Sequence, residues 1–241
     1  MAYILNFSGG KDSTALLLMI LEKGLPLDYI INVDTTKEFP QMYEHIEKVK
    51  KYIDKEIHTV SFDFDYWFKE KRRKDTSKYR DKKGYSWPSM QQRWCTALKR
   101  QGVNKKIKQL VPTGEPIIQY IGFAADEMHR AERKTNKKAN NRYPLIEWGI
   151  TEAQALQYCY DRGFDWGGLY EHFSRVSCFC CPLKSIKEVK QIYLHYPEQW
   201  AIMKEMDKYS WKTFRADYSL AQLEERFRRE IELDRRQPRL L

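Results

Sequence analysis

Short apolar runs alternate with longer amphipathic stretches along the first half of the chain. Runs of four to seven apolar residues have the length of buried strands, and the stretches between them have the length of helices. Predicted strands cover 3–7, 29–33, 57–60 and 117–123, and predicted helices cover 14–21, 40–52, 91–109, 151–163, 186–196 and 218–234. This alternation predicts an α/β fold, an open, mostly parallel twisted sheet with helices on both faces, followed by a helical C-terminal extension.

The segment 69–88 interrupts this rhythm, because it is too charged to be core and too long for an ordinary connection. Between Lys69 and Lys83 there are nine Lys or Arg residues against three acids, within a chain of net charge +10. Basic runs at 130–142 and 226–239 add to this pattern. Clustered positive charge favours a phosphate-rich partner such as tRNA or DNA, although a solvated face is the simpler alternative. The nucleic-acid contacts predicted here are Arg72, Arg73 and Lys74.

No run approaches the roughly 20 apolar residues that a membrane-spanning helix needs. The apolar run at 3–7 is also too short for a signal peptide and lacks a basic lead. We therefore expect a cytoplasmic protein without a membrane partner.

The loop after the first predicted strand reads Ser8-Gly9-Gly10-Lys11-Asp12-Ser13. Two glycines let the backbone turn tightly, and the turn leads into a helix whose first N–H groups favour an anion. Ser8 and Ser13 supply hydroxyl groups, and Lys11 supplies a positive charge. Asp12 is expected to organise the loop or to meet Mg²⁺. All six residues are predicted to bind phosphate, with Lys11 and Asp12 as catalytic residues.

This loop resembles the PP-loop of the adenine-nucleotide pyrophosphatase (adenine nucleotide alpha hydrolase-like) superfamily, and three further blocks resemble its phosphoadenosine phosphosulfate (PAPS) reductase family. The blocks are 33–38, 120–130 and 143–148. The resemblance implies nucleotide contacts from Asp34, Thr36, Gly122, Asp126 and Arg130. Thr36 departs from the family, which often has glycine at that position. Members of the superfamily cleave ATP between the α and β phosphates.

Four cysteines resemble the cluster ligands of this family. Cys95 is followed, after 82 intervening residues, by Cys178, Cys180 and Cys181. Thr96 replaces one cysteine of the family's tandem pair, and Cys180 is an additional thiol. Four thiolates suit a [4Fe–4S] cluster or Zn²⁺ as the alternative. The resemblance thus implies a nucleotide-binding domain with a Cys-rich site at 1–185 and a helical extension packed on it at 186–241.

Three functions are consistent with these features. The first is ATP activation coupled to sulfur transfer onto a nucleic acid, with a sulfur-donor protein as a further partner. The second is a sulfonucleotide reductase acting on adenylyl sulfate (APS) or PAPS with atypical thiols, since residues 222–241 contain no cysteine where such reductases carry their nucleophile. The third is a non-catalytic nucleotide-sensing or nucleic-acid-binding module. The sequence leaves the oligomeric state open.

Overall fold

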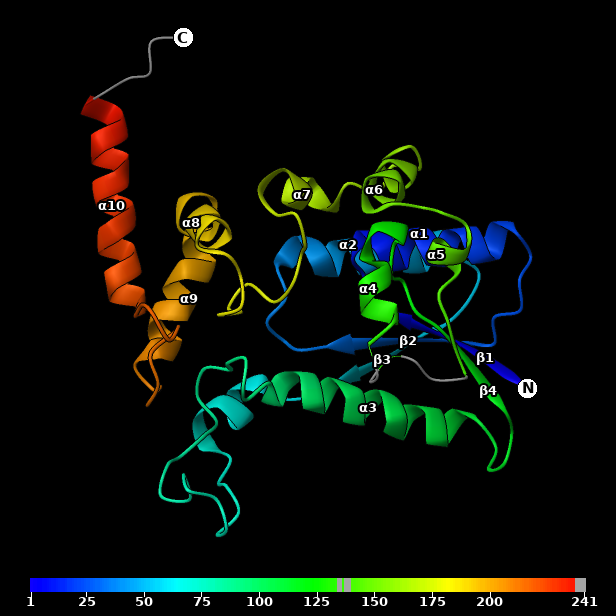
Figure 1. Ribbon diagram of the computed structural model, residues 1–241, viewed down its shortest axis with the longest axis horizontal. Helices are drawn as coiled ribbons and strands as arrows, with labels where there is room; N and C mark the ends of the chain where they lie inside the picture. Colours follow the sequence, from blue (N-terminus) through cyan, green and yellow to red (C-terminus); the bar gives the residue numbers. More distant parts are fainter. Residues whose placement is uncertain (134–135, 137–139, 237–241) are drawn as a thin grey trace. The chain divides into compact units, whose positions relative to one another are not determined.

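A computed structural model of the chain describes residues 1–133, 136 and 140–236. Five parallel strands form one sheet in the order β3-β2-β1-β4-β5 (Figure 1). The strands are β1 (Ala2–Phe7), β2 (Tyr29–Asp34), β3 (Ile57–Ser61), β4 (Ile117–Tyr120) and β5 (Asn141–Arg142). The central strand β1 has buried residues on both of its faces, such as Ile4 and Leu5. Burial on both faces requires helices on both sides of the sheet.

Helices cover both faces of this sheet, as Figure 1 shows. On one side lie α1 (Lys11–Glu22), α2 (Pro40–Tyr52), α5 (Pro144–Glu147) and α6 (Glu152–Tyr160), and on the other lies α3 (Trp94–Leu110). Ile107 and Val111, at the end of α3, pack against Ile4 of β1 and Ile31 of β2 in one apolar cluster. The α/β prediction is therefore confirmed.

The strand order places a topological switch between β1 and β4. From β1 the chain proceeds to β2 on one side, and β4 later pairs with the other side of β1. The loops that follow β1 and β4 consequently leave the sheet in opposite directions and open a crevice at the carboxyl ends of the strands. Ligands of open α/β sheets bind in this crevice.

Contacts group the chain into two compact units, each built from two segments. Unit 1 contains residues 1–62 and 98–177, and unit 2 contains residues 63–97 and 178–241. The other helices of unit 1 are η2 (Ala125–Glu127), α4 (Met128–Ala131), η3 (Trp166–Gly168) and α7 (Leu169–His172). Those of unit 2 are η1 (Tyr66–Glu70), α8 (Ile186–His195), α9 (Pro197–Asp207) and α10 (Leu220–Arg236). The predicted C-terminal helical region is confirmed, and the division into domains at residue 185 stays a prediction.

Element boundaries follow local signals where these are strong. Helix α6 starts at a capping box, in which Thr151 accepts the Gln154 N–H and the Gln154 side chain accepts the Thr151 N–H. Thr151 is the first residue of the helix predicted at 151–163. The sequence did not indicate α9 or the two-residue strand β5. No helix in the described part of the chain is long and apolar enough to cross a membrane.

Candidate functional site

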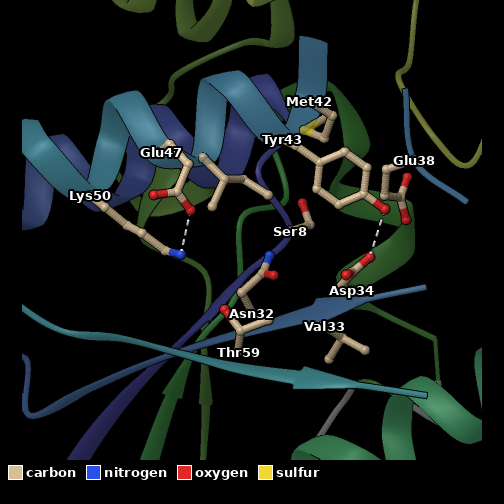
Figure 2. Close-up of a pocket in the computed structure, with 11 residues that line it drawn as sticks. Ser8, Asn32, Val33, Asp34, Glu38, Met42, Tyr43, Glu47, Lys50 and Thr59 are labelled. Carbon is tan, nitrogen blue, oxygen red and sulfur yellow. Dashed lines mark hydrogen bonds and ion pairs between the residues drawn. The ribbon is translucent and has the colours of Figure 1, made fainter. Parts of the chain in front are cut away.

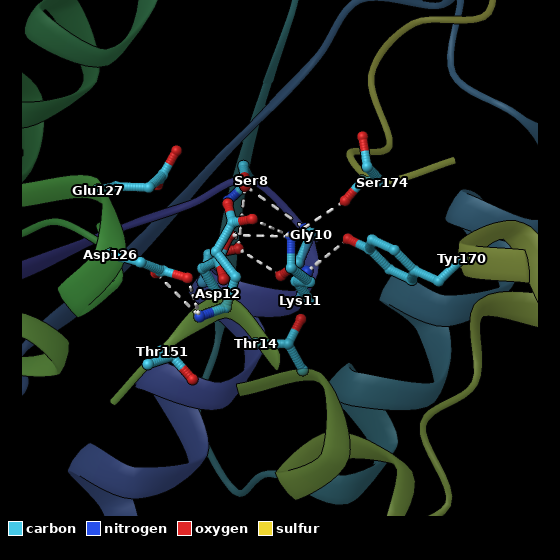
Figure 3. A network of polar contacts seen from close by, with 12 residues as sticks. Ser8, Gly10, Lys11, Asp12, Thr14, Asp126, Glu127, Thr151, Tyr170 and Ser174 are labelled. Atoms are coloured by element: carbon cyan, nitrogen blue, oxygen red, sulfur yellow. Dashed lines mark hydrogen bonds and ion pairs between the residues drawn. The ribbon is translucent and has the colours of Figure 1, made fainter. Parts of the chain in front are cut away.

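Residues 8–10 join the end of β1 to the first turn of α1 (Figure 3). Gly9 has φ +78°, in the left-handed region that favours glycine, and a Cβ there would lie 3.0 Å from Met42 Sδ. Gly10 is extended and occupies the N-cap position of α1 without a side-chain cap. The start of α1 therefore presents main-chain N–H groups and the positive end of the helix dipole to this loop, as an anion site requires.

Two serines close the loop on itself. Ser13 Oγ donates to the Gly10 carbonyl at 3.0 Å and accepts the Ser8 N–H at 3.2 Å. The hydroxyl oxygens of Ser8 and Ser13 are 3.0 Å apart, and the Gly10 N–H reaches Ser8 Oγ at 3.4 Å. The loop is thus shaped by its own hydrogen bonds, which lowers the ordering cost of binding a ligand.

Residues from α2, η3 and α7 contact the loop and the first turn of α1. Trp166 Nε1 donates to the Gly9 carbonyl at 2.7 Å, and the Lys11 N–H donates to the Tyr170 hydroxyl at 2.7 Å. His45 stacks on Trp166 and lies 3.0 Å from Thr14 Oγ1. Burial lowers the pKa of His45 to about 3, so this imidazole is neutral near pH 7. The loop therefore rests on a rigid, uncharged aromatic base.

The Lys11 side chain is buried and turns toward carboxylates. Its ammonium donates to the Ser174 carbonyl at 3.1 Å and lies 3.5 Å from Glu152 Oε2 and 3.8 Å from Asp12 Oδ2. Only 4% of Lys11 is exposed, so its charge is compensated within the protein. Lys11 thus stands among the acidic groups of the site.

Three carboxylates from three elements meet beside the loop. Asp12 of α1, Glu127 of η2 and Glu152 of α6 each offer an oxygen within 4.8 Å of the other two, a separation suited to one metal ion. Asp12 Oδ1 and Glu127 Oε2 are buried, and neither has a hydrogen-bond partner among the described residues. Buried carboxylate oxygens without a hydrogen-bond partner can coordinate a hard cation such as Mg²⁺.

The charges of this group act on Asp12. The pKa of Asp12 is raised from 3.8 to about 6, mainly by burial; Lys11 lowers it, and the neighbouring Glu152 and Glu127 raise it. A carboxyl with such a pKa is held in a costly ionised form near pH 7. Raised pKa values of this kind are typical of functional sites.

A cavity of about 150 Å³ opens between β2 and α2 (Figure 2). Ser8 of the loop and Asp34 at the end of β2 both line it, together with Met42 and Tyr43 of α2. The volume is below the roughly 300–1,000 Å³ of pockets for whole drug-sized ligands. The cavity has room for a part of a nucleotide, next to the phosphate loop.

Asp34 and Thr36 shape the turn at the end of β2. The Asp34 carboxylate accepts the Thr36 N–H at 2.7 Å and the Tyr43 hydroxyl at 2.9 Å. Thr36 has φ +59°, which a β-branched residue rarely adopts. The position where the family often has glycine is therefore left-handed here, and the Asp34 hydrogen bond helps to hold the threonine in it.

The three predicted residues after β4 have different surroundings. A Cβ on Gly122 would lie 3.1 Å from backbone atoms of Asp12 and Ser13, so this glycine lets the chain approach α1. Asp126 accepts the N–H of Glu152 at 3.1 Å. Arg130 is ion-paired with Glu127 and lies 4.1 Å over the Phe123 ring. Gly122 and Asp126 thus position the carboxylates, and Arg130 compensates one of them.

A family model for the phosphoadenosine phosphosulfate reductase domain matches residues 2–184, which include the loop, the three carboxylates and the four predicted cysteine ligands. The chain belongs to this reductase family. It is accordingly a member of the PP-loop, adenine nucleotide alpha hydrolase-like superfamily.

The chain is also similar to the uncharacterized protein MJ0066 of Methanocaldococcus jannaschii, with 25% identity over 211 residues. The match covers 80% of this chain and 39% of that relative. The chain therefore corresponds to about two fifths of the length of this curated relative.

The remaining predicted residues of this family member lie in unit 2. Cys95 and the 178–181 cysteines, far apart in sequence, belong to the same compact unit. Arg72 and Lys74 are exposed, whereas Arg73 is half-buried. The roles predicted for these residues, and for the nucleotide contacts above, stay predictions.

Four residues that the structure brings to the loop were not predicted from the sequence, namely Glu127, Glu152, Trp166 and Tyr170. Glu127 belongs to the family block after β4, beside Asp126, so an acidic pair at a strand end was an available signal. Glu152 directly follows the N-cap of α6. Trp166 and Tyr170 had no signal in the sequence, because an aromatic residue in a loop is far more often core.

Proposed function

We propose that this chain binds ATP with Mg²⁺ at the PP-loop, cleaves it between the α and β phosphates and uses the resulting activation for sulfur transfer onto a nucleic acid. The observation that carries the proposal is the Asp12–Glu127–Glu152 group beside the phosphate loop. A nucleoside triphosphate is usually bound together with Mg²⁺, which is coordinated by one or two protein carboxylates and by the phosphates. Reduction of a sulfonucleotide by a thiol has no comparable need for three converging carboxylates.

The three side chains fit the cation in number and in charge. Asp12 Oδ1 and Glu127 Oε2 are buried acceptors with no partner among the described residues, and Glu152 Oε2 lies 3.5 Å from the Lys11 ammonium. Mg²⁺ would be held by Asp12, Glu127 and Glu152, where it would neutralise charge on the phosphates. Displacing a proton from Asp12 would contribute to a pH dependence of binding.

The phosphate loop would hold the triphosphate through main-chain N–H groups at the start of α1. Ser8 and Ser13 supply hydroxyl groups at the same place, and the extended Gly10 lets a phosphate approach the backbone. The cavity beside Ser8 and Asp34 would receive another part of the nucleotide. Donors fixed in place before the reaction stabilise the charge that develops on the leaving pyrophosphate.

The reaction would proceed by attack of an acceptor oxygen on the α-phosphorus, with rupture of the bond to the bridging oxygen and departure of pyrophosphate. The acceptor then carries an adenylyl group. A sulfur nucleophile at the sulfide level, delivered by a donor protein, would displace AMP, so sulfur replaces oxygen without net oxidation. The contribution of this chain is mainly positioning of the two reactants.

We also propose that Cys95, Cys178, Cys180 and Cys181 hold a [4Fe–4S] cluster, with Zn²⁺ as the alternative. Their membership in one compact unit supports this assignment. Closely gathered thiolates need a cation, because their mutual repulsion would otherwise raise their pKa values.

Product analysis tests the proposed activity. Anaerobically purified protein is incubated with Mg²⁺, ATP and tRNA or DNA as the acceptor, and in parallel with adenylyl sulfate or PAPS and a thiol. We expect pyrophosphate from ATP and no sulfite from either sulfonucleotide. Sulfite without pyrophosphate would contradict the proposal and favour the reductase reading. Nucleotide binding without either product would favour a non-catalytic module.

A further inference from the structure

Cations and aromatic rings interleave on unit 2, around the segment that follows η1. Lys71 lies 5.3 Å from the centre of the Trp67 ring, and Lys69 lies 4.8 Å from that of Tyr209. Tyr66 and Tyr209 are 46% and 53% exposed, so about half of each residue is accessible to solvent. Rings and cations in alternation are the combination that binds unpaired nucleic-acid bases and their phosphates.

Arg73 and Lys212 come from segments nearly 140 residues apart and share the same two rings. Arg73 lies 5.4 Å from the Tyr79 ring and 5.5 Å from the Trp211 ring. Lys212 lies 5.9 Å and 4.8 Å from these rings, which are themselves 4.9 Å apart. Two cations are therefore packed onto one aromatic pair.

Neither cation has a carboxylate partner in the described part of the chain. Arg73 donates to the Tyr85 carbonyl, and Lys212 donates to Gln92 Oε1. Arg73 Nε is buried without a hydrogen-bond partner among the described residues. Burial and the proximity of Arg73 lower the pKa of Lys212. Two like charges placed close together repel each other, and a bound anion would compensate both of them.

We propose that Arg73 and Lys212 bind a phosphate group of a single-stranded nucleic acid, whose bases stack on the exposed rings of Tyr66 and Tyr209. The proposal deepens the proposed function by naming the class of sulfur acceptor, and it rests on that function only for the reaction, since binding itself is measured without ATP. Exposed Arg72 and Lys74 add long-range attraction for the backbone.

A single strand fits these features better than a duplex. In a duplex the bases are stacked on one another, so exposed rings such as Tyr66 and Tyr209 gain no partner. An unpaired base, in contrast, can stack on an aromatic ring whatever its identity. An acidic protein segment would pair with the cations but would have no base to stack on the rings.

The test is the affinity of the full chain for a fluorescein-labelled 20-nucleotide single strand, its duplex, and poly-glutamate of equal charge. Fluorescence anisotropy is recorded at two salt concentrations without nucleotide. We expect the single strand to bind tightest. The salt dependence should be log-linear, with a slope of about −0.7 per phosphate contacted.

Two variants with matched controls locate the site. Lys212→Gln should weaken single-strand binding about tenfold at low salt and reduce the slope by about 0.7, whereas Lys51→Gln on the exposed side of α2 should do little. Tyr209→Leu should weaken the single strand and leave poly-glutamate unaffected, with the exposed Tyr52→Leu as its control. Thermal melting of each variant verifies folding.

Three results would overturn the inference, namely no binding by the wild type at low salt, equal or tighter binding of the duplex or of poly-glutamate, and equal loss in Lys51→Gln and Lys212→Gln. Each leaves the formation of pyrophosphate from ATP untouched. A wild type that binds the single strand but releases no pyrophosphate would instead contradict the proposed function alone.

Discussion

At the scale of single residues, the two glycines of the phosphate loop have different tasks. Gly9 is left-handed and packed against Met42 and Ile46, whereas Gly10 has a backbone conformation open to any residue. A Cβ on Gly10 would meet nothing closer than the Tyr170 hydroxyl at 3.4 Å. Gly9 is thus needed for the fold, and Gly10 for the approach of a ligand.

This difference predicts opposite outcomes for two alanine variants. Gly9→Ala should cost about 1–2 kcal/mol of stability from its backbone conformation alone. Gly10→Ala should melt near the wild type and lose nucleotide affinity about tenfold or more, because its methyl group stands where a phosphate meets the backbone. Thermal melting and equilibrium ATP binding measure the two effects. Unchanged ATP binding in a folded Gly10→Ala variant would contradict the assignment of this loop to the nucleotide site.

The raised pKa of Asp12 predicts a pH dependence of stability. Between pH 3.8 and about 6 the folded state binds more protons at this carboxyl than the unfolded state does, so stability falls as pH rises through this window. Above pH 6 the cost is constant. Asp12→Asn should therefore raise the melting temperature by a few degrees at pH 7.5 without Mg²⁺ and change it little at pH 3.5.

The matched control is Asp28→Asn, which removes an equal charge from a different part of unit 1. A melting temperature of Asp12→Asn below that of the wild type at pH 7.5 would show that its ionised carboxylate stabilises the fold. That result would contradict the conclusion that the ionised Asp12 carboxylate destabilises the folded protein. The same variant should lose activity, as is common when a destabilised residue serves function.

At the scale of elements, the site depends on how closely β4 approaches α1. Gly122 lies at this contact, and backbone atoms of Asp12 and Ser13 cannot yield as a flexible side chain would. Gly122→Ala should therefore cost about 1–3 kcal/mol and separate Glu127 from Asp12. Denaturant unfolding measures the stability, and Mg²⁺-dependent ATP binding measures the carboxylate group. Gly102→Ala, whose Cβ would meet the Val60 side chain at 3.0 Å rather than backbone atoms, is the control for a tight contact away from the carboxylates.

The elements themselves were largely predictable, because apolar periodicity and capping signals are local. Helix α2 was expected at 40–52, where the structure has it, and Thr151, the first residue of the helix predicted at 151–163, is the N-cap of α6. The start of α1 was not predicted correctly. The polar residues 11–13 were assigned to the loop, although they form the first turn of this helix. Helix α9 was missed since it follows α8 after a single residue, Tyr196, at Pro197.

The candidate site was predictable only where it is contiguous. The loop at 8–13 was found from adjacent residues, whereas Asp12, Glu127 and Glu152 are brought together by packing of α1, η2 and α6. Nothing in a sequence marks two glutamates 25 residues apart as partners of Asp12. Tyr170 and Trp166 were hidden for the same reason, since their polar atoms meet the loop only in the folded chain.

At the scale of the whole molecule, the two units divide the predicted chemistry. Unit 1 contains the loop, the carboxylates and the cavity, and unit 2 contains the four cysteines and the basic segment. Removal of Cys95 or Cys178 should therefore release bound metal while ATP binding in unit 1 persists. Iron and zinc analysis of Cys95→Ser, Cys178→Ser and the control Cys159→Ser checks this, and loss of metal in the buried Cys159→Ser alone would contradict it.

The proposed activity determines the position at which ATP is cleaved and requires the three carboxylates. Wild-type protein with Mg²⁺ and ATP labelled at the α and γ phosphates should give AMP, or an adenylylated acceptor, and pyrophosphate. Glu152→Gln should lower the rate at least a hundredfold, while the exposed Glu132→Gln should match the wild type. Formation of ADP and phosphate, or a Glu152→Gln variant as active as the wild type, would contradict the proposed cleavage between the α and β phosphates.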